Sequence, residues 1–534
     1  MTKSLKENAG FLLILLIYFA YSLIFILRTS FTIEGERFFS LFDDAMISMR
    51  YAKNFAEGHG LVFNPSGERV EGFTNPLWVL YMAVFHLLPV AQSKISLFIQ
   101  LSGAFFLAVN LIYVKKIAGM LSNENRFVSY SAVVLTAFYL PLNTYGLQGT
   151  ETGLLALFVS LVSYLALKCI AAGDFKKSIF VLLGIGTLVR IDMAVFYIVI
   201  FLFALALFPS QRHRNLIYGI FVFLLFAAGQ TLFRVVYYDD VLPNTYYLKM
   251  TGYPLLLRVA RGFFVYWQFI KGMNPVIFAT PFVLTLFRRD RSALFLFAVF
   301  LAQSLYSVYV GGDAWEKWGG SNRFISIAMP LFFVLFAMSV EELRLFISEH
   351  SRIRESRFKY AACFLIIAAL VSFNSYGGAK SIKESLLLKD SLHVFDNRIA
   401  ADMALAVKKA TTLDASIAVV WSGAIPYFSE RPTVDLLGKN DRKIARTAMR
   451  QSPGEDGLTF FWPGHLKLDY SYSIGELKPD VLVQICIDRL CDYMNEAVPF
   501  IKGVYGKARI GGHTMFVRTG SANILWEKIL LADH

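Results

Sequence analysis

Charged side chains are scarce in this chain: Asp, Glu, Lys and Arg make up 17% of its 534 residues, whereas hydrophobic residues make up 56% and aromatic residues 16%. Soluble globular domains carry about 25% charged residues. A chain this poor in charge, with a mean hydropathy of +0.52, is typical of proteins with many membrane-spanning helices. The composition therefore predicts a polytopic membrane protein.

Several common functional motifs are also missing. The sequence has no Rossmann glycine fingerprint, no Walker loop, no zinc-binding cysteine pattern and no HExxH helix. Its net charge of +13 does not indicate a nucleic-acid partner, because the Lys and Arg residues fall in short clusters between apolar runs, as the positive-inside rule predicts. We therefore expect no nucleic-acid binding and look for chemistry in the polar loops.

Cysteine is rare, with four residues in the whole chain. Cys169 and Cys363 lie in apolar segments, where cysteine is most simply a buried small hydrophobe. Cys486 and Cys491 lie in a polar C-terminal region that the topology below places outside, where a disulfide can persist. Their spacing fits both a disulfide and two unpaired thiols.

The long apolar runs define the topology, because a spanning helix needs about 20 apolar residues. The first run, Phe11–Leu27, lacks a small-x-small cleavage site after it, so we interpret it as an anchor rather than a signal peptide. The further candidates are Leu97–Val114, Phe127–Leu140, Gly153–Leu167, Ile179–Leu188, Ala194–Phe208, Leu216–Phe233, Gly262–Phe287, Ala293–Tyr309, Phe324–Val340 and Ala361–Phe373. About 11 spans place the basic clusters and the N-terminus inside and the C-terminus outside. Pro76–Val90 is apolar but short, and we interpret it as a re-entrant or interfacial helix.

The domain organisation follows from the same hydropathy. Residues 1–375 are predicted to form a transmembrane catalytic domain whose acidic first outer loop is 28–75, and residues 376–534 an extramembrane domain. Within the latter, Ser416–Trp421, Asp480–Ile485 and Thr514–Arg518 resemble strands, and Asn397–Ala410 resembles a helix. We therefore expect a mixed α/β domain there.

The first outer loop contains two adjacent carboxylates, Asp43 and Asp44, at the start of a short predicted helix that ends at Gly58-His59-Gly60. One explanation is that one of them simply caps that helix. A cap needs only one carboxylate, so a working pair is the alternative: one deprotonates an attacking hydroxyl while the other orients it or holds a cation. Adjacency also favours a raised pKa if both are partly desolvated.

Two more outer loops combine charges with aromatic rings. Leu242–Lys249 brings amide, phenol and ammonium groups together, and Lys249 there suits a lipid phosphate. Alternatively, this segment is an aromatic belt with a snorkelling lysine. Gly311–Trp315, followed by Arg323, supplies a flexible backbone, a carboxylate, an indole and a guanidinium. Trp315 suits either stacking on a sugar or a place at the interface.

The order of these motifs resembles the membrane glycosyltransferases of the GT-C fold, and most closely the branch that includes the terminal arabinofuranosyltransferase of the mycobacterial cell wall. The segments that carry the resemblance are Asp43–Asn54, Gly58–Trp78, Gly149–Thr152, Arg190–Met193, Leu242–Lys249, Gly311–Phe324, Gly423–Phe428, Asp435–Gly438 and Pro463–His465. The family turn reads Arg-Pro-Asp-Gly where this chain has Arg190-Ile191-Asp192-Met193, so the charges are kept and the tight turn is not.

The resemblance implies transfer of a sugar from a polyprenyl-phosphate carrier to an acceptor hydroxyl on the outer face of the inner membrane, with inversion at the anomeric carbon. It makes Asp43 or Asp44 the general base. The candidate partners of the donor phosphate are Lys249, Arg323, Arg190 and Arg50, of which Arg50 could instead orient the aspartates. Candidates for sugar or acceptor binding are Glu71, Asn75, Trp78, Glu151, Asn244, Tyr246, Asp313 and Trp315.

Some members of the wider fold use a divalent cation at this acidic loop, so Asp43 and Asp44 are also candidate metal ligands, although no cofactor is certain. The acceptor implied is a glycan, a glycolipid or a protein. In the extramembrane domain, Trp421, Trp462 and His465 are candidates for holding it, with a place in the core as the alternative for each.

Two other functions remain open at this point. A transporter or flippase of lipid-linked saccharides would carry ionisable groups at mid-bilayer, and here only Arg190 and Asp192, between two short apolar segments, fit that pattern. A polymerase that joins preassembled lipid-linked units shares the compartment and the acidic loop. The sequence does not identify the sugar or the acceptor.

Overall fold

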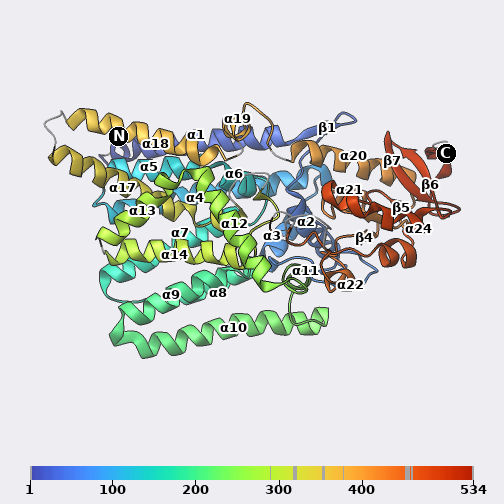
Figure 1. Ribbon diagram of the computed structural model, residues 1–534, viewed down its shortest axis with the longest axis horizontal. Helices are drawn as coiled ribbons and strands as arrows, with labels where there is room; N and C mark the ends of the chain where they lie inside the picture. Colours follow the sequence, from blue (N-terminus) through green and yellow to red (C-terminus); the bar gives the residue numbers. More distant parts are fainter. Residues whose placement is uncertain are drawn as a thin grey trace. The chain divides into compact units, whose positions relative to one another are not determined.

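The computed structural model describes residues 3–531 except 289, 317–321, 351–354, 377, 392, 451–457 and 459–460. The chain divides into two compact units, which are described separately below (Figure 1). Unit 1 comprises 1–29, 100–229 and 256–392, and unit 2 comprises 30–99, 230–255 and 393–534. The first loop and the C-terminal region therefore belong to one unit.

Unit 1 consists of helices, most of which run roughly parallel to one another in Figure 1. They are α1 (Lys3–Thr29), α5 (Arg126–Ala137), α6 (Leu140–Leu147), α7 (Thr152–Ala172), α8 (Ser178–Val189), α9 (Met193–Leu207), the 3-10 turn η1 (Pro209–Gln211), α13 (Pro275–Arg288), α14 (Arg291–Tyr309), α16 (Arg323–Ser326), α17 (Met329–Glu349), α18 (Glu355–Asn374) and α19 (Ala379–Ser385). Three further helices have residues in both units: α4 (Gln92–Leu121), α10 (Arg212–Tyr238) and α12 (Leu255–Met273).

The centre of unit 1 is α17, which packs against α5, α13, α14 and α18. Its residues 329–341 are all buried, as expected for a helix that is surrounded by others. Helix ends follow local chemistry. Asn125 accepts hydrogen bonds from the amides of Phe127 and Val128 at the start of α5, and Gly173 ends α7 in the left-handed conformation.

Among the described residues, six helices are long and apolar enough to cross a membrane, or seven if the bent pair α5 and α6 forms one span. The predicted count of about 11 is therefore not reached by this measure. One reason is that the predicted span Gly262–Phe287 is broken at Asn274, whose φ of 72° separates α12 from α13. The other reason is that α8, α9 and the apolar part of α13 are shorter than a bilayer requires, as is α3 (Pro76–His86).

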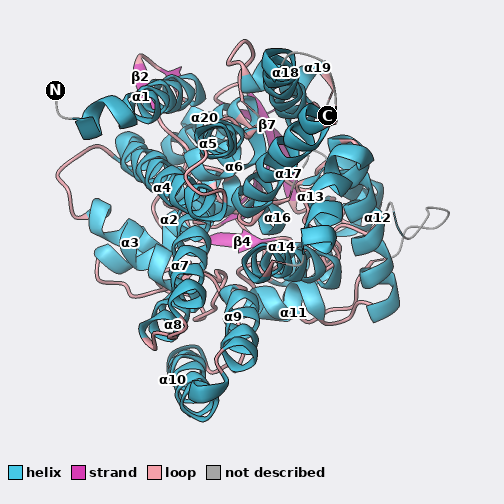
Figure 2. Ribbon diagram, turned by 90° about the vertical axis from the view of Figure 1, so that its left-hand side faces the viewer, coloured by secondary structure: helices cyan, strands magenta, loops and turns pink. Residues whose placement is uncertain are grey.

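Unit 2 is a mixed α/β structure, as predicted for the C-terminal region, and Figure 2 shows its strands in magenta. A six-stranded sheet has the order β4-β3-β5-β7-β6-β8. The strands β3 (Ile417–Val419), β4 (Thr433–Asp435) and β5 (Val481–Leu482) are parallel, while β6 (Tyr505–Ile510), β7 (His513–Arg518) and β8 (Leu530–Leu531) add antiparallel pairs. A separate hairpin joins β1 (Phe31–Ile33) to β2 (Glu36–Phe38).

The helical elements of unit 2 are α2 (Asp43–Ala56), α3, α11 (Asn244–Met250), α20 (Val394–Ala410), α21 (Ala424–Ser429), α22 (Arg442–Ala445), α24 (Val498–Ile501), the π-helix η2 (Ser471–Glu476) and the 3-10 segments η3 (Asp488–Glu496) and η4 (Trp526–Lys528). Helix α2 packs on α3 and on α21, and α11 packs on α22. The acidic first loop and the segment Leu242–Lys249 are therefore both in contact with the C-terminal region.

The cysteines fall into two groups. Cys486 and Cys491 form a disulfide that closes a short loop beside η3. Cys169 is buried, as predicted, whereas Cys363 is exposed. The prediction for Cys363 was wrong because α18 packs on its neighbours with one face only and leaves Tyr360, Phe364 and Ile367 exposed on the other.

Candidate active site

The two aspartates occupy the first turn of α2, where the helix dipole favours negative charge. Neither of them caps the helix, because Phe42 holds the N-cap position and no side chain makes a capping hydrogen bond. Asp44 accepts a hydrogen bond from Nζ of Lys439, with 2.7 Å between Nζ and Oδ1. Asp43 accepts one from the backbone amide of Ala424 at 3.3 Å, while its Oδ2 is buried without a hydrogen-bond partner.

Lys439 is held by a tight turn that follows β4. Asp435 accepts hydrogen bonds at 2.9 Å from both the backbone amide and the side-chain amide of Asn440. Gly438 adopts a φ of 74°, and a Cβ there would lie 2.7 Å from the side chain of Ile444, so the turn favours glycine. The turn thus fixes the backbone from which the Lys439 side chain reaches Asp44.

Asn244, a candidate sugar ligand, lies at the same turn. Its Nδ2 donates to the carbonyl oxygens of Gly438, Lys439 and Asp441 at 2.9, 3.0 and 3.2 Å. Its side chain is 3% exposed, so it acts here as a support of the Lys439 turn rather than as an accessible ligand.

The charges of this cluster are coupled. Burial raises the pKa of Asp43 to about 6, and although Lys439 opposes this effect, the neighbouring Asp44 adds to it. Burial alone would lower the pKa of Lys439, but the carboxylates of Asp44 and Asp43 raise it above its ordinary value. At neutral pH Asp43 is therefore mostly ionised and Lys439 carries its positive charge.

An aromatic group lies next to the same lysine. Lys439 Nζ is 5.9 Å from the ring centroid of Trp421, and His465 stacks on Trp462 with 4.3 Å between ring centroids. Burial lowers the pKa of His465 to about 3, and the positive charges of Lys439 and Lys249 contribute in the same direction. His465 is therefore neutral at physiological pH.

Lys249 runs alongside this group. A Cβ built on Gly464 would lie 3.1 Å from Cε of Lys249, and Gly464 has a φ of 78°. Glycine at this position therefore lets the lysine stem pass close to the backbone next to His465. Unit 2 thus brings Asp43, Asp44, Lys249 and Lys439 into one neighbourhood.

The other candidates of unit 2 serve the framework. Arg50 donates to the carbonyl oxygens of Phe63 at 2.7 Å and Arg431 at 2.8 Å, to that of Pro426, and to Asn64 Oδ1 at 3.1 Å. It is 4% exposed and holds loop backbone together. A phosphate would have to displace these contacts.

Glu71 forms a buried ion pair with Arg234, with 2.7 Å between Oε2 and Nε. Asn75 Oδ1 accepts a hydrogen bond from Ser48 at 3.1 Å. Trp78 is 1% exposed and stacks on Tyr81, whereas Tyr246 is 40% exposed. Of these four predicted ligands of sugar or acceptor, only Tyr246 presents a large part of its surface.

In unit 1 the short break between α8 and α9 forms a compact ionic group. Arg190 binds Asp192 with two contacts, Nε to Oδ1 at 2.7 Å and Nη2 to Oδ2 at 2.6 Å. Its Nη1 donates to Oε1 of Glu151 at 3.0 Å. The structure thus joins the segment Gly149–Thr152 to the turn Arg190–Met193, and neutralises much of the charge on Arg190.

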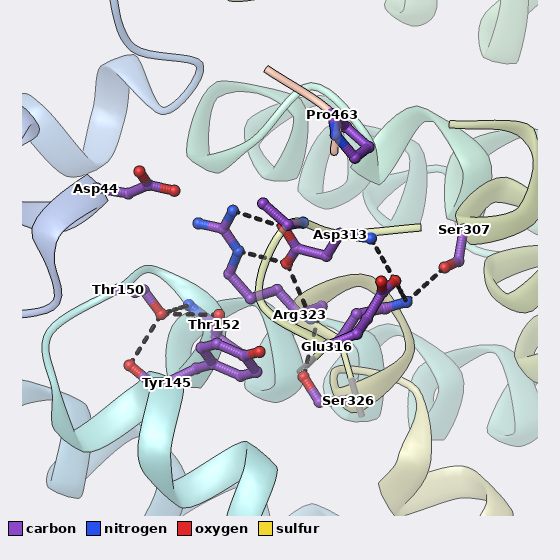
Figure 3. Close-up of polar contacts among 12 residues, drawn as sticks. Asp44, Tyr145, Thr150, Thr152, Ser307, Asp313, Glu316, Arg323, Ser326 and Pro463 are labelled. Atoms are coloured by element: carbon purple, nitrogen blue, oxygen red, sulfur yellow. Dashed lines mark hydrogen bonds and ion pairs between the residues drawn. The ribbon is translucent and has the colours of Figure 1, made fainter. Parts of the chain in front are cut away.

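The loop that contains Gly311, Gly312 and Asp313 forms a second ionic group in unit 1. Figure 3 shows the carboxylate of Asp313 facing the guanidinium of Arg323. Arg323 donates from Nε to Oδ2 at 2.8 Å and from Nη2 to Oδ1 at 3.0 Å. Glu316 pairs with Arg261 at 2.6 Å and accepts from the amide of Asp313 at 2.5 Å. Trp315 is 3% exposed, so the structure does not present it as a stacking surface.

A divalent cation fits this donor set poorly. Among the residues that the structure describes, no group of three His, Cys, Asp or Glu side chains is arranged to hold a metal ion. Asp43 and Asp44 are the two candidate ligands, and Lys439 already binds one oxygen of Asp44. Mg²⁺ is usually bound through one or two carboxylates with waters and substrate phosphates, so the feature that disfavours it here is the ammonium of Lys439 beside Asp44.

Lys439, Asp435, Arg234 and Glu316 were not among the predicted site residues. For Asp435 and Lys439 a signal existed, because the segment Asp435–Gly438 was part of the family resemblance and Lys439 follows it directly. Glu316 lies within the segment Gly311–Phe324, and Arg234 precedes the segment Leu242–Lys249. Neither residue is a position that the family motifs specify.

Asp43→Asn is expected to stabilise the protein at neutral pH. Because burial raises the pKa of Asp43 from 3.8 to about 6, the folded state holds this proton more tightly than the unfolded chain. Stability therefore falls as the pH rises from about 4 to about 6. Asparagine has no charge to bury, so the variant should gain about 1–3 kcal/mol at pH 7 and nothing below about pH 4.

The measurement is equilibrium unfolding in detergent micelles at about pH 4 and about pH 8. Asp414→Asn is the matched control, since Asp414 is an exposed aspartate of the same unit. A variant of Asp43 that is less stable than the native protein at both pH values contradicts the assignment.

Comparison with known proteins adds two findings on sequence. A family model described as a domain of unknown function (DUF8728) matches residues 391–519, which include β3, β4 and the Lys439 turn. No curated protein sequence matches this chain significantly.

Solved structures give a likeness over nearly the whole chain. ArnT from Cupriavidus metallidurans in the apo state has a TM-score of 0.54 at 14% identity, with 96% of this chain and 98% of that chain covered. ArnT bound to undecaprenyl phosphate has a TM-score of 0.52 at 14% identity, with coverages of 95% and 98%. Archaeal oligosaccharyltransferase AglB from Archaeoglobus fulgidus, in complex with an inhibitory peptide and a dolichol-phosphate, has a TM-score of 0.51 at 12% identity, with coverages of 97% and 75%.

ArnT and AglB are GT-C glycosyltransferases. The likeness establishes the GT-C fold for this chain, as predicted, and the apolar helices agree with a membrane protein. At identities this low the comparison is one of fold.

Proposed function

We propose that this protein is a glycosyltransferase that moves a single sugar from a polyprenyl-phosphate carrier to a hydroxyl of an envelope glycan or glycolipid. The outer face of the inner membrane is the proposed site of the reaction. The observation that carries the proposal is the pair Asp43 and Asp44 at the start of α2, of which Asp44 is bound to Lys439 and Asp43 has a buried oxygen without a partner. The GT-C fold supports it, because ArnT was solved bound to undecaprenyl phosphate and AglB with a dolichol-phosphate.

Asp44 is the proposed general base. Its side chain is 20% exposed, whereas Oδ2 of Asp43 is buried, so Asp44 is the more accessible to an acceptor. In a single displacement the acceptor oxygen bonds to the anomeric carbon, its proton passes to Asp44, and the carbon–oxygen bond to the phosphate breaks. The sugar is inverted and polyprenyl phosphate leaves.

The leaving phosphate needs positive charge as its bond breaks. Lys249 is the proposed partner in unit 2, since it runs past Gly464 beside the neutral His465. Arg190 and Arg323 are weaker proposals, because each is already engaged by carboxylates. The closeness to the arabinofuranosyltransferase branch favours a pentofuranose as the sugar.

The experiment is intact-mass analysis of envelope glycans and glycolipids from a deletion strain complemented with the native gene. Loss of one sugar mass in the deletion strain, restored by the native protein, is the expected result. Loss of a whole repeat unit would instead identify a polymerase. Unchanged glycans, or complete carrier-linked precursors trapped on the cytoplasmic face, would overturn the proposal.

A further inference from the structure

The positive charge next to the two aspartates comes from the chain itself. Lys439 is the cation, and the side chains of Lys439 and Asp44 are 6% and 20% exposed. Its Nζ lies 2.7 Å from Oδ1 of Asp44, within the usual range for a charge-assisted hydrogen bond. In many acidic sites a bound metal ion supplies this charge.

Hydrogen bonds fix the backbone of Lys439, the residue that carries the ammonium. Lys439 lies in the turn that Asp435 closes by accepting hydrogen bonds from the backbone amide and the side-chain amide of Asn440. Asn244 Nδ2 donates to the carbonyl oxygen of Lys439 itself and to those of Gly438 and Asp441. The backbone at Lys439 is therefore fixed by its own turn and by Asn244 of α11, so it need not become ordered when Lys439 pairs with Asp44.

The same contact leaves little room for a metal ion. Nζ of Lys439 occupies Oδ1 of Asp44, and an ammonium at that distance would repel a divalent cation bound to the same carboxylate. Asp43 adds one accessible ligand at most, because its Oδ1 accepts from the amide of Ala424 and its Oδ2 is buried. His465 has its Nδ1 on the carbonyl oxygen of Pro463, and the described residues contain no group of three metal-binding side chains.

We propose that Lys439 takes the place of a divalent cation beside Asp43 and Asp44, so that the acidic loop of this protein works without metal. Lys439 is then a positioning residue that holds the carboxylate of Asp44 in one direction. This inference rests on the proposed function for its effect on transfer, but its statement about metal binding stands independently of it.

The first test uses the metal alone. Purified full-length protein, stripped with a chelator, is titrated with Mn²⁺ and followed by electron paramagnetic resonance. The expected result is that no bound Mn²⁺ signal depends on Asp44, so the native protein and Asp44→Asn give the same titration. One bound ion per chain that disappears in Asp44→Asn would overturn the proposal, whether or not transfer has been detected.

The second test follows the sugar transfer in isolated membranes of the complemented strain. Excess chelator should leave the native rate unchanged, and a loss that Mn²⁺ or Mg²⁺ restores would overturn the proposal. Lys439→Gln should lose at least about tenfold in rate and shift the acid limb of the pH profile upward, because the carboxylates then lack their counter-charge. Lys439→Arg keeps the charge and should retain most of the activity.

The pH profile separates positioning from mere support of the fold. The titratable and charged groups around Asp44 are Asp43 on the same helix, Lys439 and Asp435 on the turn, and His465 with Lys249 beside it. A purely structural role would lower the yield of Lys439→Gln and leave the acid limb where it was. Native rate with the native profile in Lys439→Gln would overturn the proposal, whereas absence of transfer in the native protein itself would refute only the proposed function.

Discussion

Asp44→Asn should reduce sugar transfer by about 10²–10⁴-fold, the range that a positioned general base contributes. The amide has almost the shape of the carboxylate but accepts no proton from the attacking hydroxyl. The substitution also leaves the buried ammonium of Lys439 without its counter-charge. The readout is the rate at which the native sugar mass reappears in membranes of the complemented deletion strain.

Two further variants separate chemistry from folding. Asp44→Asn combined with Lys439→Gln removes both charges of the pair and should recover part of the stability that the single variant loses, because the buried ammonium that lacked its Asp44 partner is gone. If Asp44 is the base, the double variant stays inactive although it is well folded. Asp414→Asn, at an exposed position, should transfer at the native rate. A double variant that recovers transfer would rule Asp44 out as the base.

The fold could be read from the sequence because hydropathy and motif order are both long-range signals. The runs that became α1, α4, α7, α10 and α14 stood out by length and composition. The strands β3, β5 and β7 followed from short apolar runs in a polar region, whereas β4, β6 and β8 were not predicted. The number of spans could not be read in the same way, because α8, α9 and α13 are short helices whose burial depends on neighbours and Asn274 breaks an apparently continuous run.

The candidate site was predicted only in part, because side-chain pairing across distant segments has no local signal. Asp44 and Lys439 are 395 positions apart, and neither residue's neighbours in sequence specify the other. Motif residues also divide into those that face a site and those that hold it. Asn244 and Arg50 are of the second kind, because both donate to backbone carbonyl oxygens of the C-terminal region. Their sequence motifs did not distinguish them from residues that face a site.

Arg190→Met should lower the free energy of unfolding by about 3–5 kcal/mol, the usual cost of removing one partner from a buried ion pair. The side chains of Arg190, Asp192 and Glu151 are 7%, 1% and 9% exposed. Without the guanidinium, two buried carboxylates face each other with no cation between them. The measurement is equilibrium unfolding in mixed detergent micelles, with Arg126→Met as the control because Arg126 is exposed in the same unit.

A stability loss on this scale would mark Arg190 as part of the framework of unit 1. The triple variant that adds Glu151→Gln and Asp192→Asn removes the unpaired charges, so it should regain most of the lost stability. If the triple variant is stable and still transfers sugar, Arg190 binds no donor phosphate. If Arg190→Met unfolds like the native protein but fails in transfer, the ion pairs with Asp192 and Glu151 are energetically minor and the guanidinium serves the substrate.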